Sequence, residues 1–340
     1  MIGLWETESV IEFPALADTE RMTASTGRPS STKGTFVISL DTELSWGCFD
    51  TVGVDQYREA YRNTRSVIDG LCDLFDTYDA PATWAMVMHL FEECSGHEDA
   101  VEPTFDWIDS WYRKAPCATE GETELWYAPD VLERIRATDI DHELGVHGYS
   151  HVILGDPGCS REAATEEIRR AVAVAERLDV GTDSFVFPRN EIGHLDLLER
   201  FGFQCFRGLD ARWYEASAPS PIRRACRFGD EFLGRTPPTV TPSTRSGLIE
   251  IPGSQILRPD HGHWKYTPAS SQVTRAIRGL DRAADRGEIF HLWFHPFNFG
   301  VGPERHLDMF ERILAHAAKL RRDGRLEIEP MNAIDPPEDT

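Results

Sequence analysis

The chain has 340 residues, a hydrophobic content of 41% and a mean hydropathy of −0.39, which are typical of a folded globular protein. It carries 57 acidic against 35 basic residues, a formal net charge of −22, which argues against a nucleic-acid or anionic-membrane partner, since both require basic patches. Only four of the basic residues are lysine, and an acidic, lysine-poor surface indicates adaptation to a salt-rich cytoplasm, that is, a halophilic protein. An ordinary acidic protein encoded by a GC-rich genome is the alternative.

The expected compartment is the cytoplasm. Residues 1–22 lack the basic stretch and apolar core of a signal peptide, and no segment approaches the ~20 apolar residues of a membrane span. The seven cysteines are scattered without a Cys-x-x-Cys pair, and their odd number cannot all pair within one chain. They are therefore expected to be reduced thiols.

The body of the chain shows alternating strand and helix patterns. Apolar, β-branched runs predict strands at residues 35–40, 82–88, 143–146, 184–187, 204–206, 248–251 and 288–294. Helical spacing of apolar residues predicts helices at residues 55–78, 129–138, 161–178, 195–201, 273–286 and 304–322. Residues 92–121 are expected to be a loop or insertion, and 207–246 form the least regular part.

Such alternation is typical of a parallel sheet, here one closed into a barrel. We expect a flexible N-terminal arm at residues 1–34, a single barrel domain at 35–330 and a tail at 331–340.

Carboxylates and imidazoles follow separate predicted strands. Asp41 and Glu43 come directly after the first apolar run, and His147 and His151 follow the run that ends at Val146. The two histidines could bind one ion if the chain turns at Gly148, or if it continues as a helix with both on one face. Asp41 and Glu43 share a face if their strand continues. One carboxylate can then bind a divalent metal while the other accepts a proton from water, which is typical of hydrolytic metal sites.

These segments resemble the polysaccharide deacetylase, or NodB-homology, family of carbohydrate esterases. The resemblance covers about residues 35–330 and is carried by Asp41-Thr-Glu43, His147-Gly-Tyr-Ser-His151, Phe187-Pro-Arg189-Asn190 and Leu292-Trp-Phe-His295. It implies an α/β fold, a distorted (β/α)7 barrel with its site at the carboxyl ends of the strands. The family's acidic segment usually reads Asp-Asp, so Glu43 lies one position further on than expected, and Asp41 is the alternative ligand.

The resemblance implies a role for each motif residue. Glu43, His147 and His151 would hold one divalent metal ion, with zinc expected and cobalt or another transition metal as the alternative. Asp41 would act as the general base, Arg189 would lie behind it and hold it ionised, and His295 would protonate the leaving amine.

Three aromatic residues near the motifs are candidates for stacking against a sugar: Trp46, Tyr149 and Trp213. Trp46 is the strongest of them, because a loop after Glu43 would bring it close to the metal. His291 shares a strand face with His295 and is expected to be structural.

The sequence therefore predicts a metal-dependent hydrolase that removes N-acetyl groups from an N-acetylated sugar. A cytoplasmic location favours a nucleotide- or lipid-linked precursor as substrate. One alternative is an allantoinase-like or other non-sugar amide hydrolase on the same barrel. Another is a catalytically silent barrel that binds glycan or protein. No nucleic-acid partner is expected, and the oligomeric state is left open.

Overall fold

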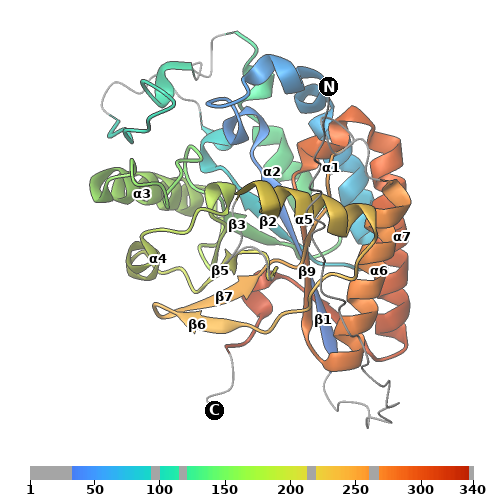
Figure 1. The fold of residues 1–340 in the computed structure, drawn as a ribbon. Helices are drawn as coiled ribbons and strands as arrows, with labels where there is room; N and C mark the ends of the chain where they lie inside the picture. Colours follow the sequence, from blue (N-terminus) through green and yellow to red (C-terminus); the bar gives the residue numbers. More distant parts are fainter. Residues whose placement is uncertain (1–32, 93–99, 115–120, 213–219, 260–267, 337–340) are drawn as a thin grey trace, which may run out of the picture.

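The computed structural model describes residues 33–92, 100–114, 121–212, 220–259 and 268–336 (Figure 1). Its centre is one ten-stranded sheet. The strands are β1 (Gly34–Thr42), β2 (Thr83–Met86), β3 (Glu143–Val146), β4 (Ser184–Phe185), β5 (Cys205–Gly208), β6 (Ser243–Arg245), β7 (Leu248–Pro252), β8 (Gln255–Ile256), β9 (Ile289–Phe294) and β10 (Leu326–Glu329).

The sheet is parallel almost throughout and curls into a distorted barrel. Its strand order is β6-β7-β5-β4-β3-β2-β1-β9-β8, with β10 pairing with the start of β1. Among the strand pairs of the described residues, that of β6 with β7 is antiparallel. β8 is the last strand at one end of this order, and β7 lies next to the edge strand β6 at the other end, yet two residues of chain join β7 to β8. The expected single α/β barrel is confirmed, with a sheet that is open at this point rather than fully closed.

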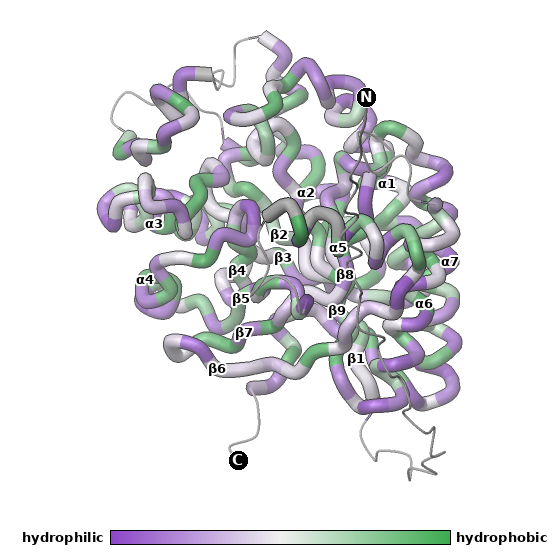
Figure 2. The backbone as a smooth tube through the Cα atoms, in the orientation of Figure 1, coloured by the Kyte–Doolittle hydropathy of each residue, from purple (hydrophilic) through white to green (hydrophobic). Residues whose placement is uncertain are grey.

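Helices cover the outside of the sheet. They are α1 (Arg58–Tyr78), α2 (Pro129–Arg136), α3 (Arg161–Arg177), α4 (Leu195–Arg200), α5 (Ser220–Phe232), α6 (Ala269–Arg286) and α7 (Pro303–Arg322). In Figure 1, α1, α6 and α7 pack together on one side, and α3 and α4 lie on the other. Hydrophobic residues line the inner strands, and hydrophilic residues recur along the outer helices (Figure 2). None of the helices in the described ranges is long and apolar enough to cross a membrane.

Six helices lie where the spacing predicts them, within a few residues at each end. The prediction was wrong for α5, which lies inside the segment 207–246 that was expected to be the least regular part of the chain. Pro221 stands at the start of α5, where a proline is tolerated because the first helical N–H groups need no partner in the helix. The prolines at 237, 238 and 242 lie beyond its end, so the proline content of the segment does not interrupt the helix.

Packed structure begins close to residue 34 and continues beyond residue 330. β1 begins at Gly34, and residues 1–32, the predicted arm, lie outside the described residues. Packed structure continues past residue 330, because Met331 is fully buried and its backbone N–H donates to the hydroxyl of Thr83.

Candidate active site

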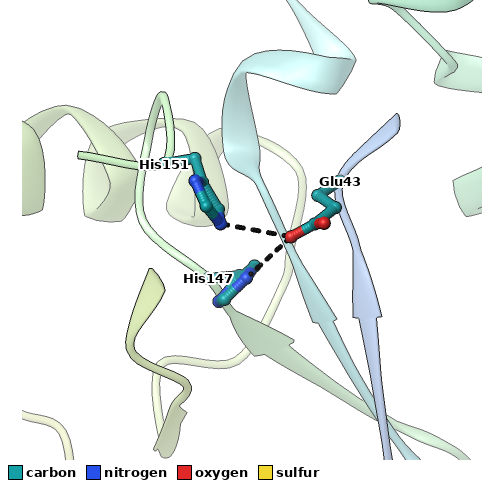
Figure 3. Close-up of side chains that lie close together, drawn as sticks. All are labelled: Glu43, His147 and His151. Carbon is teal, nitrogen blue, oxygen red and sulfur yellow. Dashed lines mark hydrogen bonds and ion pairs between the residues drawn. The ribbon is translucent and has the colours of Figure 1, made fainter. Parts of the chain in front are cut away.

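Three side chains that could ligate a metal meet at the carboxyl ends of β1 and β3 (Figure 3). Oε2 of Glu43 lies 3.1 Å from Nε2 of His147 and 3.2 Å from Nε2 of His151. One potential ligand atom from each residue lies within 4.8 Å of the others, and all three residues are buried. Carboxylate oxygen and imidazole nitrogen at this spacing form the donor set of a catalytic zinc-type site with three protein ligands.

Neighbouring groups fix the orientation of the His147 and Glu43 side chains. Nδ1 of His147 lies 2.8 Å from the carbonyl oxygen of Val186, which can only accept, so this nitrogen carries a proton and the ring is held with Nε2 towards Glu43. Gly47 permits the carboxylate of Glu43 to take its place. A Cβ at Gly47 would lie 1.8 Å from Oε1 of Glu43, so any other residue there would displace the ligand.

The turn between the two histidines is held by Glu167 of α3. One carboxylate oxygen of Glu167 accepts hydrogen bonds from the backbone N–H groups of Tyr149, Ser150 and Val152 at 2.7 to 3.2 Å. Gly148 has a φ of +82°, and a Cβ there would lie 2.9 Å from the same oxygen. The chain therefore turns at Gly148, as one of the two alternatives predicted, and the turn directs both imidazoles to one point.

Asp41 is held by an arginine on β5. Arg207 donates from Nη1 to Oδ1 of Asp41 at 2.6 Å and from Nη2 to Oδ2 at 2.7 Å, a bidentate ion pair between two buried side chains. Arg207 also donates to Ser39 and Asn190, and its guanidinium lies 4.2 Å from the ring centre of Trp293. These contacts fix Asp41 beside the metal-type cluster.

His295 completes the group from the end of β9. Its Nε2 lies 3.6 Å from Oδ2 of Asp41 and 3.5 Å from Oε1 of Glu43. Its side chain is 20% exposed, whereas those of Asp41 and Glu43 are 3% exposed. Because β1 and β9 pair in parallel with Leu40 opposite Phe294, the next residues in each strand, Asp41 and His295, are brought together. His295 thus stands between the buried acids and solvent.

The electrostatics of the cluster favour a bound cation. Burial opposes the charged form of Glu43, but the surrounding histidines outweigh it and hold the pKa of Glu43 well below its usual value. Burial opposes ionisation of Asp41 too, and Arg207 nevertheless lowers its pKa. Burial also opposes a charge on His147, yet its hydrogen bond to Glu43 and the charge of Asp41 raise its pKa. A field that draws a proton to His147 draws a metal cation equally, so the residues fit a divalent ion.

His151 differs from His147 because burial lowers its pKa. A neutral imidazole is the form that binds metal. Nδ1 of His151 has no hydrogen-bond partner within the described part of the chain, so nothing there competes for its tautomer.

Arg189 does not contact Asp41, and the predicted arrangement was wrong on this point. Its Nη2 lies 2.6 Å from both carboxylate oxygens of Asp50, which is fully buried in the loop after β1. Nε1 of Trp107 donates to the same carboxylate at 2.9 Å. The reason is the backbone: Arg189 and Asn190 both have positive φ angles, of 55° and 56°, which carry the side chain towards Asp50 and leave Asp41 to Arg207.

The expected aromatic platform is not formed by Trp46 or Tyr149. Trp46 is fully buried, donates to the carbonyl of Trp126 and packs edge-on against it, so it belongs to the core. Tyr149 is 4% exposed, and its hydroxyl donates to Glu92 at 2.5 Å. Both rings are buried because their apolar surface packs in the core. Trp213 lies outside the described residues.

His291 has the structural place that was expected. It is fully buried, and its Nε2 lies 2.9 Å from the hydroxyl of Ser39. Burial, reinforced by Arg207, lowers the pKa of His291 to about 3, so the ring is neutral and cannot act as a general acid near neutral pH.

Two residues that organise the site were missed in the sequence. Arg207 interrupts the buried strand Cys-Phe-Arg-Gly, and Glu167 lies on the apolar face of α3 between Ala164 and Ile168. A charged residue at an apolar position of a buried element was the available signal, since such a charge needs a buried partner.

A (β/α) barrel with a Glu-His-His cluster at the carboxyl ends of its strands is typical of metal-dependent hydrolases. Residues 48–194 match the family described as Polysaccharide deacetylase. This match agrees, over that part of the chain, with the NodB-homology family that the motifs predict. Members of this family are hydrolytic deacetylases that act on amide carbon–nitrogen bonds.

Solved structures share the fold across nearly the whole chain. A protein described as "putative polysaccharide deacetylase from Mycobacterium smegmatis" is 17% identical, with 92% of this chain and 96% of that chain covered and a TM-score of 0.57. A "probable polysaccharide deacetylase from Pseudomonas aeruginosa PAO1" is 12% identical, with 88% and 89% covered and a TM-score of 0.56. An allantoinase is 12% identical, with 95% and 96% covered and a TM-score of 0.57. No curated protein matches the chain in sequence.

Proposed function

We propose that this protein is a metal-dependent N-deacetylase that hydrolyses the acetamido group of an N-acetylated sugar. The observation that carries the proposal is that a metal-type donor set lies beside a possible general base and a possible general acid. The buried donor set of Glu43, His147 and His151 adjoins Asp41, which is held ionised, and His295, which is partly exposed. The polysaccharide deacetylase match supports the sugar acetamide as substrate class.

In this proposal each residue has one task. Glu43, His147 and His151 would hold a divalent ion, with zinc as the first expectation and cobalt or another transition metal as alternatives. When bound, the ion supplies Lewis acidity, which polarises a carbonyl and lowers the pKa of water towards neutrality.

Asp41 accepts the proton of the attacking water, and Arg207 keeps Asp41 ionised for that purpose. His295, on the solvent side of Asp41, donates a proton to the departing amine and so makes it a leaving group. A cytoplasmic location and a nucleotide- or lipid-linked precursor complete the proposal.

A second candidate is hydrolysis of a non-sugar amide of the allantoin type. The fold is as similar to an allantoinase as to the deacetylase from Mycobacterium smegmatis, with the same TM-score of 0.57. Fold similarity at this level of identity leaves the substrate open. Both candidates would use the cluster of Glu43, His147 and His151, and they differ in the amide that is hydrolysed.

The test combines metal analysis with a substrate panel. Purified protein is analysed for bound metal, then assayed for acetate release from N-acetylglucosamine oligosaccharides and precursors and for turnover of allantoin, with and without chelator. One ion per chain and chelator-sensitive acetate release, lost in His147→Ala and kept in His316→Ala, would support the deacetylase. His316 is a matched control because it pairs with Asp281 on the outer helices. Metal with allantoin turnover alone would favour the second candidate, and neither metal nor turnover would leave a binding protein.

A further inference from the structure

Positive charge is concentrated in one region of this acidic chain. Residues 220–286 contain 11 basic and 6 acidic side chains, although the whole chain has a net charge of −22. This region includes α5, the loop after it and α6. A local excess of arginine against an acidic background attracts anions to that region.

The same region contains a cavity of about 370 Å³. Four arginines line it, Arg212, Arg235, Arg275 and Arg282, and Asp230 is the one acidic lining residue. A cavity of this size holds a small organic ligand rather than a single water. The lining chemistry favours a ligand with negative charge and several hydrogen-bond acceptors.

The inner arginines form a rigid floor. Arg212 and Arg275 are each 3% exposed in their side chains, and both lie within 4.0 Å of the buried carboxylate of Glu231. Nε of Arg275 also donates to the carbonyl of Arg235 at 2.9 Å. Since their positions are fixed by these contacts, they lend charge to the cavity without having to rearrange.

The outer arginines of the cavity, Arg235 and Arg282, make fewer contacts than the inner pair within the described residues. Arg282 donates once, from Nη1 to the carbonyl of Pro237 at 2.9 Å, and within the described ranges it has no carboxylate at salt-bridge distance. Burial and the charges of Arg286 and Arg235 lower the pKa of Arg282 and outweigh the opposing charge of Glu288. Arg235 is 62% exposed and lies 3.5 Å from Asp230.

We propose that this cavity binds a phosphate group, with Arg235 and Arg282 donating to its oxygens over the floor of Arg212 and Arg275. A guanidinium matches two phosphate oxygens at once, and converging arginines are the usual means of binding a tetrahedral oxyanion. The phosphate would add negative charge beside Arg282, which has no carboxylate at salt-bridge distance within the described residues.

The phosphate can have two sources, the substrate itself or a separate phosphorylated ligand. A structural link favours a role towards the reaction site. Arg212 lies 3.1 Å from Asp210, which accepts a hydrogen bond from Trp293 at 2.9 Å, and the ring of Trp293 lies 5.8 Å from that of His295. Only this assignment to the substrate rests on the proposed function; the phosphate site itself does not.

Isothermal titration with inorganic phosphate at constant ionic strength tests the site on the full-length, metal-containing protein. We expect one phosphate per chain and an affinity at least tenfold weaker in the double variant Arg235→Gln/Arg282→Gln. Arg235→Gln alone, at a mostly exposed position, is expected to give an intermediate loss. Arg169→Gln is the matched control because it removes an exposed arginine of α3, paired with Glu166, and should bind phosphate as the unaltered protein does.

Equal binding by the double variant and the unaltered protein would overturn the proposal, since the anion would then lie elsewhere, for instance on the metal. Absence of binding to the unaltered protein at millimolar phosphate would also overturn it. Hydrolysis assays separate the two sources. A raised KM of the double variant for phosphorylated but not unphosphorylated acetamido sugars assigns the phosphate to the substrate, and unchanged KM values with lost phosphate binding assign it to a separate ligand. If none of the acetamido sugars is hydrolysed, the proposed function is rejected. The titration with phosphate still tests the phosphate site in that case.

Discussion

Replacing Arg207 tests the central electrostatic claim about the site. Arg207 is the cation that keeps Asp41 ionised, through two hydrogen bonds of 2.6 and 2.7 Å between buried groups. In Arg207→Met the carboxylate stays buried without its partner, and the burial that already opposes its ionisation then dominates. The pKa of Asp41 should therefore rise above its value in the unaltered protein.

Two magnitudes follow from the structure. Breaking a buried ion pair by removing one partner costs about 3–5 kcal/mol, so the free energy of unfolding should fall by that amount at neutral pH. A general base contributes roughly 10²–10⁴-fold to the rate, so kcat/KM at neutral pH should fall within that range as Asp41 becomes protonated. The acid limb of the kcat/KM profile should move to higher pH, because a raised pKa leaves Asp41 protonated over a wider range.

The assay is a pH profile of acetate release, with urea unfolding measured on the same preparations. Arg189→Met is the matched control, since it also removes an arginine from a buried carboxylate, that of Asp50. It should lower stability without moving the acid limb. An acid limb that stays in place in Arg207→Met, or that moves equally in Arg189→Met, would refute the assignment of Arg207 to Asp41.

Three further results are expected. Glu167→Ala removes the acceptor of three N–H groups in the turn between the histidines, so metal affinity measured by competition with a chelator should fall by roughly 10–100-fold; unchanged affinity would contradict the role of the turn. Gly148→Ala forces a side chain into φ +82°, which should cost about 1–2 kcal/mol of unfolding free energy and weaken metal binding as well; a variant as stable as the original would show that the turn relaxes. Burial lowers the pKa of His142 from 6.5 to about 4, so the unfolded chain takes up this proton first as the pH falls, and stability should decline by about 1.4 kcal/mol per unit between pH 6.5 and 4 on this account. His142→Asn, which keeps an acceptor for the N–H of Ala82, should flatten that slope in urea titrations, and parallel slopes would exclude His142 as the cause.

Local pattern alone was sufficient for most of the architecture. Buried parallel strands require continuous apolar runs and the covering helices require one apolar face, so both leave periods that can be read without coordinates. The helix α5 was not predicted because its segment is rich in proline. These prolines lie at its start and beyond its end, where they do not interrupt the helix. The short strands β6 and β8 contain two or three residues, too few for any period to show.

The metal-type cluster was also visible in the sequence, because parallel strands bring their carboxyl ends to one edge. Glu43 follows β1, and His147 and His151 follow β3, so all three lie at that edge of the sheet. What the sequence could not decide is which cation faces Asp41. Arg189 and Arg207 both follow or end neighbouring strands, and the choice depends on two positive φ angles at Arg189 and Asn190 and on the register of β5.

The same holds for aromatic rings. Trp46 lies three residues from Glu43, yet only the packing of Trp46 against Trp126 decides that it belongs to the core and does not face the substrate. Strand ends and ligand types follow from local chemistry, which the sequence carries by itself. The partner of a buried charge and the direction of a side chain depend on residues distant in the chain, so only the tertiary structure decides them.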